Sequence, residues 1–452
     1  IMICLLRCLL LSVAICFSAS TFAQAQETYK VKKKDTVYGI AHKYGLTIDE
    51  LLKANPNAAD ADFNIKKGTV LVIPKPSATV KTAPTSASPK PATVKAAVSA
   101  NGAINVGIML PLHNNDGDGR RMVEYYRGLL MAFDRLKQDG ISTNVYAWNV
   151  SNTTNVSTLF GDANLQKCNI IFGPLYTTQV KPLAAFCKEH DIKMVIPFSI
   201  SGNDVETCPE IFQVYQSQQV LTARAADAFM DRFKGRHVIF IDCNDSTSRK
   251  GAFTALLRQK LESAGMKYSI TNLRSSEQMF SKAFSRSQQN VVVLNTGRSP
   301  ELNVAFAKLN SLKATDPSVT ISMYGYTEWL MYTKVYLELY HKYDAYIPTT
   351  FYYNPMDSET AKVDNEYRRW FHSDMQTALP RFALTGYDHG QFFLRGYKKY
   401  GKRFEGARWQ NGYISLQNQL KFVKTGSKGG MQNSGFMLVH YRSGGGAETI
   451  SY

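Results

Sequence analysis

The sequence lacks the patterns that mark most enzymes and metal-binding proteins. None of the Gly-x-Ser-x-Gly, HExxH, Ser-x-x-Lys or P-loop patterns occurs, and the eight histidines have no ligand spacing. The glycine-containing turn at residues 426–430 is not followed by Lys-Ser/Thr, so it does not cradle a phosphate. CxxC pairs are also absent. These absences predict a protein that is not an enzyme and that needs neither a cofactor nor a metal.

Hydrophobic runs long enough to cross a membrane are absent too. The one long apolar run, Cys8 to Phe17, has ten residues, whereas a membrane-spanning helix needs about 20. Arg7 precedes this run and the small-x-small pattern Ala23-Gln24-Ala25 follows it. Together these features indicate a secretory signal peptide at residues 1–25. We therefore expect an exported protein of the periplasm or cell envelope, with no transmembrane segment.

Acidic residues are few beside the basic ones, with 36 Asp and Glu against 53 Lys and Arg, a formal net charge of +17. Such an excess of base is typical of proteins that bind nucleic acid. Removal of residues 1–25 takes away one base and no acid, which leaves +16 on an exported chain. For an exported protein we expect no nucleic-acid partner. The anionic polymers and phospholipid headgroups of the envelope are the natural counter-charges.

Cysteine is scarce, with seven residues of which three fall within the predicted signal peptide. The remaining four are Cys168, Cys187, Cys208 and Cys243. An oxidising compartment permits disulfides among them in three possible connectivities, but a chain of this length folds without such cross-links. The sequence therefore leaves two alternatives for these four cysteines, disulfides or buried free thiols.

Composition divides the rest of the chain into three parts. Residues 26–75 form a compact unit, residues 76–102 a linker rich in Pro, Ala, Thr, Ser, Val and Lys, and residues 103–452 a large body. The linker has no aromatic residue and too little apolar surface to fold. In a partly polyproline conformation, at about 3.1 Å per residue, it extends over several tens of Å. The linker is predicted to be a tether.

The compact unit has the pattern strand, helix, helix, strand. Asp35-Thr36 caps a first helix whose apolar residues repeat at i, i+3, i+4 and i+7, and Thr47–Glu50 is a capping box that opens a second helix. Strands are predicted at Tyr29–Val31 and Thr69–Ile73. The motifs Tyr29-x-Val31, Asp35-Thr36-Val37, Ala54-Asn55-Pro56 and Leu71-x-Ile73-Pro74 resemble a LysM module along its whole length. Lys34 stands where that family usually has Gly.

The LysM resemblance implies binding of glycans that contain N-acetylglucosamine, here peptidoglycan, in a shallow groove between two loops. The implied glycan-binding residues are Asp35, Thr36, Val37, Tyr38, Asn55, Pro56 and Ile65. Loop backbone groups and small polar side chains bond to an acetamido group, and Val37 and Ile65 offer apolar contact to its methyl group. Asp35 and Thr36 also suit a helix cap.

The body alternates short apolar strands with helices. Strands are expected at Ile104–Leu110, Asn144–Val150, Asn169–Phe172, Lys193–Ile196, His237–Asp242, Asn290–Leu294 and Val319–Met323. Strands of continuous apolar character that alternate with helices indicate parallel sheets covered on both faces. The fold class is therefore α/β.

Several motifs of the body occur in the order and spacing of the type I periplasmic binding proteins of the leucine-binding class. They are Ile108–Pro111, Arg127–Asp134, Ile170–Leu175, Met194–Pro197 and Gly386-Tyr387-Asp388. The resemblance implies two Rossmann-like lobes joined by a hinge that the chain crosses three times. We place lobe one at about residues 103–218 and 350–408, and lobe two at about residues 219–349 and 409–450.

In that family the ligand lies between the lobes, beyond the carboxyl ends of the strands. The candidate cleft residues are Thr177, Thr178, Ser199, Ser201, Asp245 and Tyr326. The family's ligand-binding hydroxyl falls on Thr177, but its second hydroxyl falls on Ile200. The isoleucine disfavours simple capture of an amino acid. Thr178 also suits a helix cap, and Tyr326 also suits packing.

These patterns predict a non-catalytic envelope protein. Its LysM module would bind peptidoglycan, and its two-lobed domain would bind a small ligand or an envelope protein. One alternative is a solute-binding protein that delivers amino acids or peptides to an ABC importer. Another is a regulator of cell-wall synthesis that uses the fold as a docking scaffold. A peptidoglycan hydrolase is disfavoured because no catalytic constellation is visible.

Overall fold

The computed structural model describes residues 27–32, 40, 43–44, 46, 51, 53–55, 68–74, 102–198, 202–410 and 412–452. The chain divides into two compact units, the first including residues 1–89 and the second residues 90–367 and 374–452. The predicted signal peptide and residues 76–101 of the predicted linker lie outside the described residues. Within the described part, none of the helices is both long and apolar enough to cross a bilayer.

The first unit contains a two-stranded antiparallel sheet. Strand β1 (Glu27–Lys30) pairs with β2 (Val70–Ile73), and Tyr29 lies opposite Leu71. Of the two predicted helices, residues 40, 43, 44, 51, 53 and 54 are described, and all are helical except Tyr44, which lies in a turn. The buried apolar side chains of the unit are those of Val31, Ile40, Leu46, Leu51, Leu71 and Ile73. The two strands and this small core agree with the predicted strand, helix, helix, strand order.

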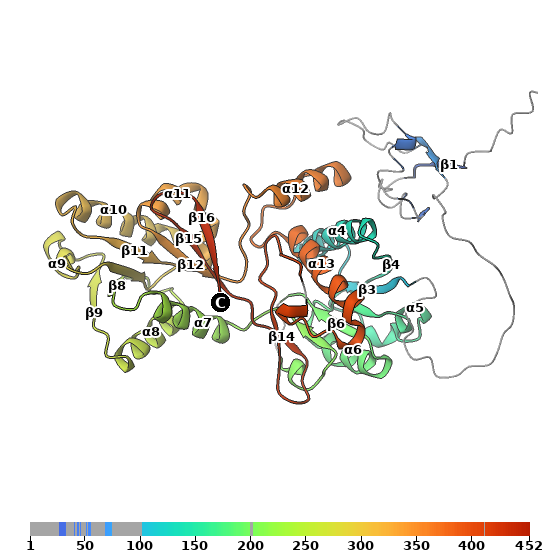
Figure 1. Ribbon diagram of the computed structural model, residues 1–452, viewed down its shortest axis with the longest axis horizontal. Helices are drawn as coiled ribbons and strands as arrows, with labels where there is room; N and C mark the ends of the chain where they lie inside the picture. Colours follow the sequence, from blue (N-terminus) through green and yellow to red (C-terminus); the bar gives the residue numbers. More distant parts are fainter. Residues whose placement is uncertain are drawn as a thin grey trace, which may run out of the picture. The chain divides into compact units, whose positions relative to one another are not determined.

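The second unit consists of two α/β lobes, which Figure 1 shows joined by extended segments. The strands of lobe one are β3 (Ile104–Leu110), β4 (Thr143–Asn149), β5 (Ile170–Phe172), β6 (Lys193–Ile196), β7 (Ile211–Gln213), β13 (Phe422–Lys424) and β14 (Met431–Asn433). They form one sheet in the order β13-β14-β7-β6-β5-β3-β4, parallel except at β13. The helices in these parts of the chain are α4 (Gly117–Gln138), η2 (Val156–Leu159), α5 (Ala163–Gln166), α6 (Thr177–His190), η3 (Asp204–Glu206), α12 (Ser358–Phe371), α13 (Phe382–Tyr400), η5 (Gly401–Arg403) and η6 (Arg408–Gln410).

Lobe two has a second seven-stranded sheet. Its strands are β8 (His237–Asp242), β9 (Tyr268–Asn272), β10 (Asn290–Leu294), β11 (Ile321–Tyr324), β12 (Ala345–Thr349), β15 (Met437–Tyr441) and β16 (Ala447–Ser451). The order is β16-β15-β12-β11-β10-β8-β9. The β12–β15 and β15–β16 pairs are antiparallel, and the other pairs are parallel. The helices are α7 (Gln218–Arg232), α8 (Gly251–Ser263), α9 (Glu277–Lys282), α10 (Ser299–Thr315), η4 (Thr327–Tyr332) and α11 (Thr333–Lys342).

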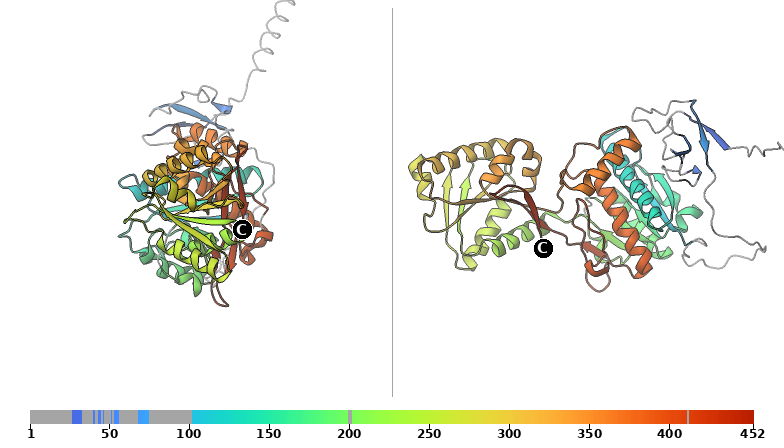
Figure 2. Two further views of the ribbon diagram at one scale, coloured as in Figure 1. Left: turned by 90° about the vertical axis from the view of Figure 1, so that its left-hand side faces the viewer. Right: turned by 45° about the horizontal axis from the view of Figure 1, so that its top comes forward.

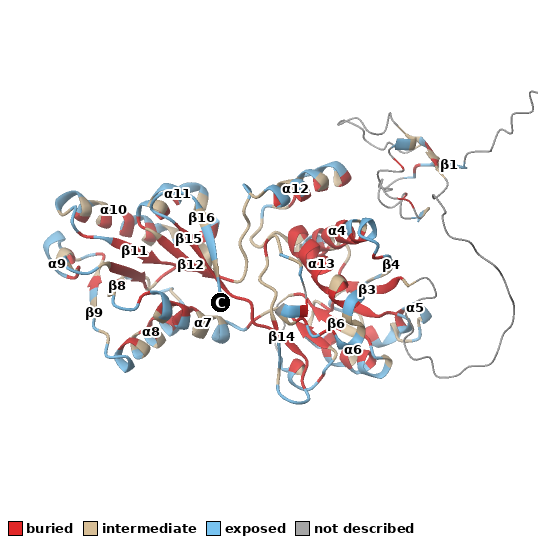
Figure 3. Ribbon diagram, in the orientation of Figure 1, coloured by how far each residue is buried: buried red, intermediate tan, exposed pale blue. Residues whose placement is uncertain are grey.

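The strands of the two sheets are the core of the unit. Every residue of β3, β10 and β12 is buried, whereas the edge strands β4, β9 and β16 are largely exposed or half-buried. Helices lie on both faces of the sheets, with their buried sides inward (Figures 2 and 3). Continuous apolar strands need such cover, because both of their faces must leave water. The predicted α/β fold with two parallel sheets is confirmed, and the predicted strands begin and end within about two residues of the observed ones.

The boundary between the lobes differs from the prediction near the C-terminus. The chain passes between the lobes after β7, after β12 and between β14 and β15. The prediction placed the third passage near residue 408 and assigned residues 409–450 to lobe two. Instead, β13 and β14 extend the sheet of lobe one, because β14 pairs with β7. This pairing joins segments more than 200 residues apart, so no local pattern of the sequence marks it.

Two glycines allow the helices α4 and α13 to lie against each other in lobe one. A Cβ atom on Gly128 would lie 1.8 Å from the Ala383 carbonyl oxygen, and one on Gly386 would lie 2.0 Å from the Tyr125 carbonyl oxygen. Both distances are far below van der Waals contact, so only glycine fits. The motifs that contain Gly128 and Gly386 are therefore explained by close helix packing.

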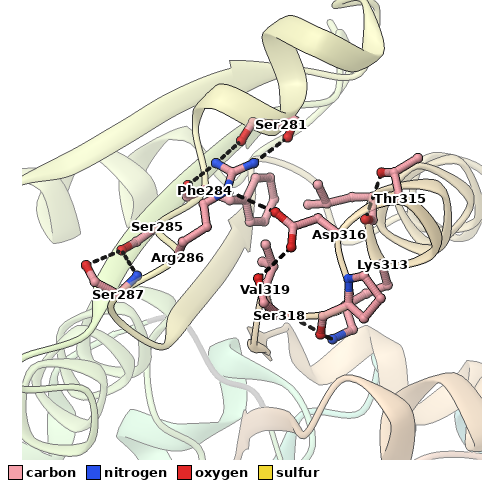
Figure 4. A network of polar contacts seen from close by, with 12 residues as sticks. Ser281, Phe284, Ser285, Arg286, Ser287, Lys313, Thr315, Asp316, Ser318 and Val319 are labelled. Carbon is pink, nitrogen blue, oxygen red and sulfur yellow. Dashed lines mark hydrogen bonds and ion pairs between the residues drawn. The ribbon is translucent and has the colours of Figure 1, made fainter.

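A polar network holds the amino-terminal edge of the lobe-two sheet (Figure 4). Arg286 donates hydrogen bonds to the carbonyl oxygens of Ser281 (2.9 Å) and Phe284 (2.7 Å) and to the carboxylate of Asp316 (3.0 Å). Ser318 donates to the other oxygen of Asp316 at 2.5 Å. The hydrogen bonds from Ser318 and Arg286 lower the pKa of Asp316, and the bond from Ser318 has the larger effect. The network ties together the segments that lead into β10 and β11.

Candidate functional site

A cavity of about 910 Å³ lies between the two lobes of the second unit. Its apolar residues from lobe one include Met122, Leu175, Pro197, Phe198 and Phe382, and those from lobe two include Leu221, Ala225, Phe253, Tyr326 and Met331. Residues of the three passages, such as Gln216 and Phe351, also line it. The volume falls within the range of roughly 300–1,000 Å³ of small-molecule sites.

The lining residues follow the carboxyl ends of the strands. Leu175, Phe198 and Gln216 come shortly after β5, β6 and β7, and Tyr326 comes shortly after β11. Parallel strands end at a common edge, so these loops meet there although they are far apart in the chain. The Arg286 network lies at the opposite edge of the lobe-two sheet. The cavity and the Arg286 network therefore lie at different edges of the lobe-two sheet.

Tyr326, one of the predicted cleft residues, lines the cavity. Its hydroxyl donates to the carbonyl oxygen of Leu294 at 2.5 Å, and its ring packs edge to face on Phe253 at 5.7 Å. Burial raises the pKa of Tyr326 well above its usual value of 10. The hydroxyl is thus engaged with the protein, and the ring is the part that a ligand would meet.

Lobe two brings three charged side chains to the cavity, Arg249, Lys250 and Glu328, and the last two form an ion pair. Lys250 Nζ lies 2.5 Å from Glu328 Oε1 and 4.7 Å from the centre of the Tyr326 ring. The two side chains are 22% and 40% exposed. This ion pair neutralises two of the three charged side chains that lobe two brings to the cavity.

Asp245 is predicted in the cleft, but the structure places its carboxylate inside a turn. It accepts hydrogen bonds from the backbone N–H and hydroxyl of Thr247 (2.9 and 2.6 Å) and from the hydroxyl of Thr296 (2.7 Å), and Arg298 Nη1 lies 3.3 Å away. The bonds from Thr247 and Thr296 lower the pKa of Asp245 to about 2. Asp245 is not among the residues that line the cavity.

Thr177 and Thr178 are the first two residues of α6, and both are exposed. Neither lines the cavity. The other predicted lobe-one residues, Ser199 and Ser201, lie outside the described residues, as does Ile200. Of the four predicted cleft residues that the structure describes, Tyr326 lines the cavity.

Two polar residues that the sequence analysis did not select also line the cavity, His389 and Gln216. His389 is fully buried in α13, and its Nδ1 lies 2.9 Å from the Tyr125 hydroxyl. Burial lowers the pKa of His389 to about 3, so the ring is neutral at physiological pH. Only the position of His389 directly after the Gly386-Tyr387-Asp388 motif could have drawn attention to it.

Asp388 holds the segment that runs beside the second passage. Its carboxylate accepts hydrogen bonds from the backbone N–H groups of Leu416, Gln417 and Asn418, at 2.7 to 2.9 Å, and from the Tyr413 hydroxyl at 2.8 Å. Burial raises the pKa of Asp388, although these bonds lower it. Asn418, which Asp388 positions, lines the cavity.

In the first unit, Asn55 is the one described residue of the predicted glycan-binding set. Its side-chain amide donates to the carbonyl oxygens of Leu51 and Val72 at 2.8 Å, and its Oδ1 accepts from the Val72 N–H at 2.8 Å. Asn55 thus joins the end of a helix to β2. The predicted glycan residues Asp35, Thr36, Val37, Tyr38, Pro56 and Ile65 lie outside the described residues.

The four cysteines of the second unit are free, buried thiols. Burial raises the pKa of Cys208 to about 11, of Cys168 and Cys243 to about 12, and of Cys187 well above its usual value of 9. Thiols with such pKa values are poor nucleophiles. Among the described residues, no group of His, Cys, Asp and Glu is arranged to hold a metal ion.

Comparison with known families identifies the first unit. Residues 29–74 match the LysM domain. This finding confirms the resemblance seen in the sequence motifs. Comparison of the chain with curated proteins gives no match.

Comparison with solved structures identifies the fold of the body. A putative branched-chain amino acid ABC transporter protein from Rhodospirillum rubrum is 14% identical, with a TM-score of 0.52, and the match covers 77% of this chain and 100% of that one. An ABC transporter substrate-binding protein from Desulfitobacterium hafniense, in complex with Leu, is 13% identical over 77% and 100% of the two chains, with a TM-score of 0.41. LpoA from Haemophilus influenzae is 14% identical over 77% and 59%, with a TM-score of 0.47. The likeness to the Rhodospirillum rubrum protein shows the two-lobed fold of type I periplasmic binding proteins.

Proposed function

We propose that this is a non-catalytic protein of the cell envelope that holds peptidoglycan through its LysM domain and binds a small, largely apolar ligand between its two lobes. The observation that carries the second part is the cavity of about 910 Å³, with apolar and aromatic walls from both lobes. Burial of an apolar molecule there is favourable by roughly 25 cal/mol per Å² of apolar surface removed from water.

The polar groups of the cavity argue for an apolar ligand over a free amino acid. An amino acid carries an ammonium and a carboxylate, and each must find a partner when it leaves water. Lys250 and Glu328 are paired with each other, and Thr177 and Thr178 do not line the cavity. The Tyr326 hydroxyl already donates its hydrogen bond to the carbonyl oxygen of Leu294. None of these groups is therefore available in the wall to pair with the ammonium or the carboxylate.

The LysM domain at residues 29–74 supports the proposed binding of peptidoglycan. The cluster Lys30, Lys32, Lys33 and Lys34 lies within this domain, where it attracts the anionic stem peptides of peptidoglycan. The Pro-rich segment at residues 76–102 separates the domain from the body. We infer that the LysM domain anchors the chain to the wall while the tethered body samples the surrounding space.

The anchoring is tested by sedimentation with purified sacculi. The full chain should sediment with the sacculi, and a chain that lacks residues 26–75 should stay in the supernatant. Equal retention of both chains would refute the anchoring.

The cavity ligand is tested by native mass spectrometry of the purified full chain, followed by release and identification of the bound molecule. We expect an apolar or amphipathic compound. The name of the Rhodospirillum rubrum protein favours the alternative of a branched-chain amino acid carrier. Tight binding of leucine in a calorimetric titration would establish that alternative instead.

A further inference from the structure

Two residues that line the cavity each have one polar atom with no hydrogen-bond partner in the described part of the chain. The atoms are Nε2 of His389 and Oε1 of Gln216, and both atoms are buried. His389 is 0% exposed and Gln216 is 3% exposed. The opposite end of each group is engaged, because His389 Nδ1 meets the Tyr125 hydroxyl and Gln216 Nε2 donates to the carbonyl oxygen of Gly435 at 2.7 Å. Each side chain is therefore held in place with one polar atom unused.

Both residues belong to the end of lobe one that faces the cavity. Gln216 follows β7, and α13, which carries His389, packs on the same sheet through Phe393 and Phe212, whose ring centres lie 5.3 Å apart. Phe198, which follows the neighbouring strand β6, lies 5.1 Å from the Tyr125 ring and 5.5 Å from the Phe382 ring. The unused polar atoms thus lie at the same end of the lobe as an aromatic wall.

Buried polar groups in folded proteins are nearly always hydrogen-bonded, because an unpaired one loses its bonds to water without compensation. An unpaired atom in a cavity wall is explained when the ligand supplies its partner. Gln216 Oε1 only accepts, so the ligand must donate to it. His389 Nε2 donates in one tautomer and accepts in the other, and the Tyr125 hydroxyl suits either.

The charge of this pair restricts the ligand further. The amide of Gln216 is neutral, and the imidazole of His389 is neutral because burial keeps its pKa at about 3. An ammonium or a carboxylate placed against these two groups would leave water and gain no counter-charge from them, which is unfavourable. A hydroxyl or an amide can pair with such neutral groups without that cost.

We propose that His389 and Gln216 form a polar subsite for a neutral head group with a hydrogen to donate, a hydroxyl or an amide, on a ligand whose apolar body lies along Phe198 and Phe382. The half-buried Phe198 ring moves aside to admit the head group. This inference rests on the proposed function, since it assumes that the cavity takes an apolar ligand. It adds the chemical class of that ligand, an amphipathic molecule with a neutral head.

The test is a calorimetric titration of the full chain with four octyl compounds: 1-octanol, octanamide, octanoate and octylammonium. The four share one apolar chain and differ in the head group. We expect octanol and octanamide to bind at least about 10-fold more tightly than the two ions.

The same titration on variants identifies the residues. His389→Asn keeps a partner for the Tyr125 hydroxyl near the position of Nδ1 and removes Nε2, so it should weaken octanamide binding by about 10-fold. His341→Asn, in α11 and outside the cavity, is the matched control and should bind as the unmodified chain does. Near-ultraviolet circular dichroism of each variant checks that the fold is kept. If His389→Asn does not fold, Gln216→Glu replaces it, because a carboxylate there should reverse the preference in favour of octylammonium.

The outcomes separate this inference from the function on which it rests. If none of the octyl compounds binds, the proposed apolar ligand is wrong and the subsite fails with it. If all four bind equally and His389→Asn has no effect, the cavity takes apolar ligands but the polar subsite is refuted. Preference for the neutral heads that is lost in His389→Asn supports both.

Discussion

At the residue scale, the buried carboxylate of Asp388 organises one wall of the cavity. Asp388 is 0% exposed and accepts bonds from three successive backbone N–H groups, from the Tyr413 hydroxyl and from the side chain of Asn418. The donors come from a segment that also bonds to the second passage, where Tyr352 N–H donates to the carbonyl oxygen of Gln417. A single side chain in α13 therefore positions the chain beside the hinge.

The substitution Asp388→Asn tests this role. An amide of the same shape turns an NH₂ group toward some of these donors and leaves buried N–H groups without an acceptor, so the second unit should lose about 3 kcal/mol of unfolding free energy. Urea unfolding followed by circular dichroism measures the change. Asp227→Asn, on the surface beside Lys260, is the control and should change stability by less than about 1 kcal/mol. Equal effects of the two substitutions would show that the Asp388 bonds contribute little.

At the element scale, the packing of α4 against α13 depends on the two glycines at their contact. Both helices are otherwise lined with large buried side chains, such as Leu129, Phe133 and Phe393. The backbones approach most closely where Gly128 and Gly386 face the opposite helix, and one turn further along α13 Gly390 faces Ala132. The aromatic residues then pack on either side of that point and fill lobe one.

Gly386→Ala should destabilise lobe one, because the added methyl group would lie 2.0 Å from the Tyr125 carbonyl oxygen. Overpacking against backbone cannot be relieved by a rotamer change, and we expect a loss of about 3 kcal/mol. Gly161→Ala is the matched control, since its Cβ would meet nothing within 4 Å. Thermal unfolding of the two variants measures the difference. A loss in Gly386→Ala no larger than in Gly161→Ala would mean that the helices move apart freely.

The antiparallel end of the lobe-two sheet is held by a polar cluster around His440. Its ring nitrogens lie 2.7 Å from Asp344 Oδ1 and 2.9 Å from Glu448 Oε1, and the ring stacks on Tyr346 with centres 3.9 Å apart. The pKa of Glu448 is lowered from its usual value of 4.5, and the hydrogen bond to His440 is the largest cause. Asp344 also has a lowered pKa, because the bonds from His440 and Ser322 outweigh its burial.

These lowered pKa values predict an acid-sensitive contact. A carboxyl group whose pKa is lower in the folded chain than in the unfolded one adds stability above its unfolded pKa, and that stability is lost as the pH falls through the folded pKa. The melting temperature of the second unit should therefore drop as the pH falls below about 4.5, partly through Asp344 and Glu448. In Glu448→Gln this drop should be smaller, because one of the two titrating groups is gone. Glu359→Gln, in the exposed pair with Lys362, is the control, and a pH profile identical in both variants would contradict the role of Glu448.

At the scale of the whole molecule, the excess of 17 positive charges is spread over a chain that joins a LysM domain to a two-lobed domain. Charges spread in this way attract an anionic surface over a distance without specifying a site. The lysine cluster at residues 30–34 is the local concentration nearest to the LysM motifs. Its position suggests that charge assists the encounter with the wall.

Binding to sacculi should therefore weaken when salt rises from 50 to 500 mM, since the screening length falls several-fold over that range. Substitution of Lys30, Lys32, Lys33 and Lys34 by Gln should reduce the salt dependence. The control replaces four exposed lysines of the second unit, Lys234, Lys267, Lys424 and Lys428. Sedimentation assays at each salt concentration give the comparison. Binding that is independent of salt would remove any role for the cluster.

The sequence by itself determined the LysM domain, the α/β class and the two-lobed arrangement, because each depends on local patterns. Caps, apolar periods and short motifs such as Asp35-Thr36-Val37 and Ile170–Leu175 act within a few residues. The tertiary structure decided the features that depend on contacts between segments far apart in the sequence. It placed β13 and β14 in the sheet of lobe one. It also engaged the Asp245 carboxylate within a turn of lobe two and brought His389 and Gln216 to the cavity wall. The physical reason is that an unused hydrogen-bonding atom is visible only when every neighbour from the rest of the chain is in place.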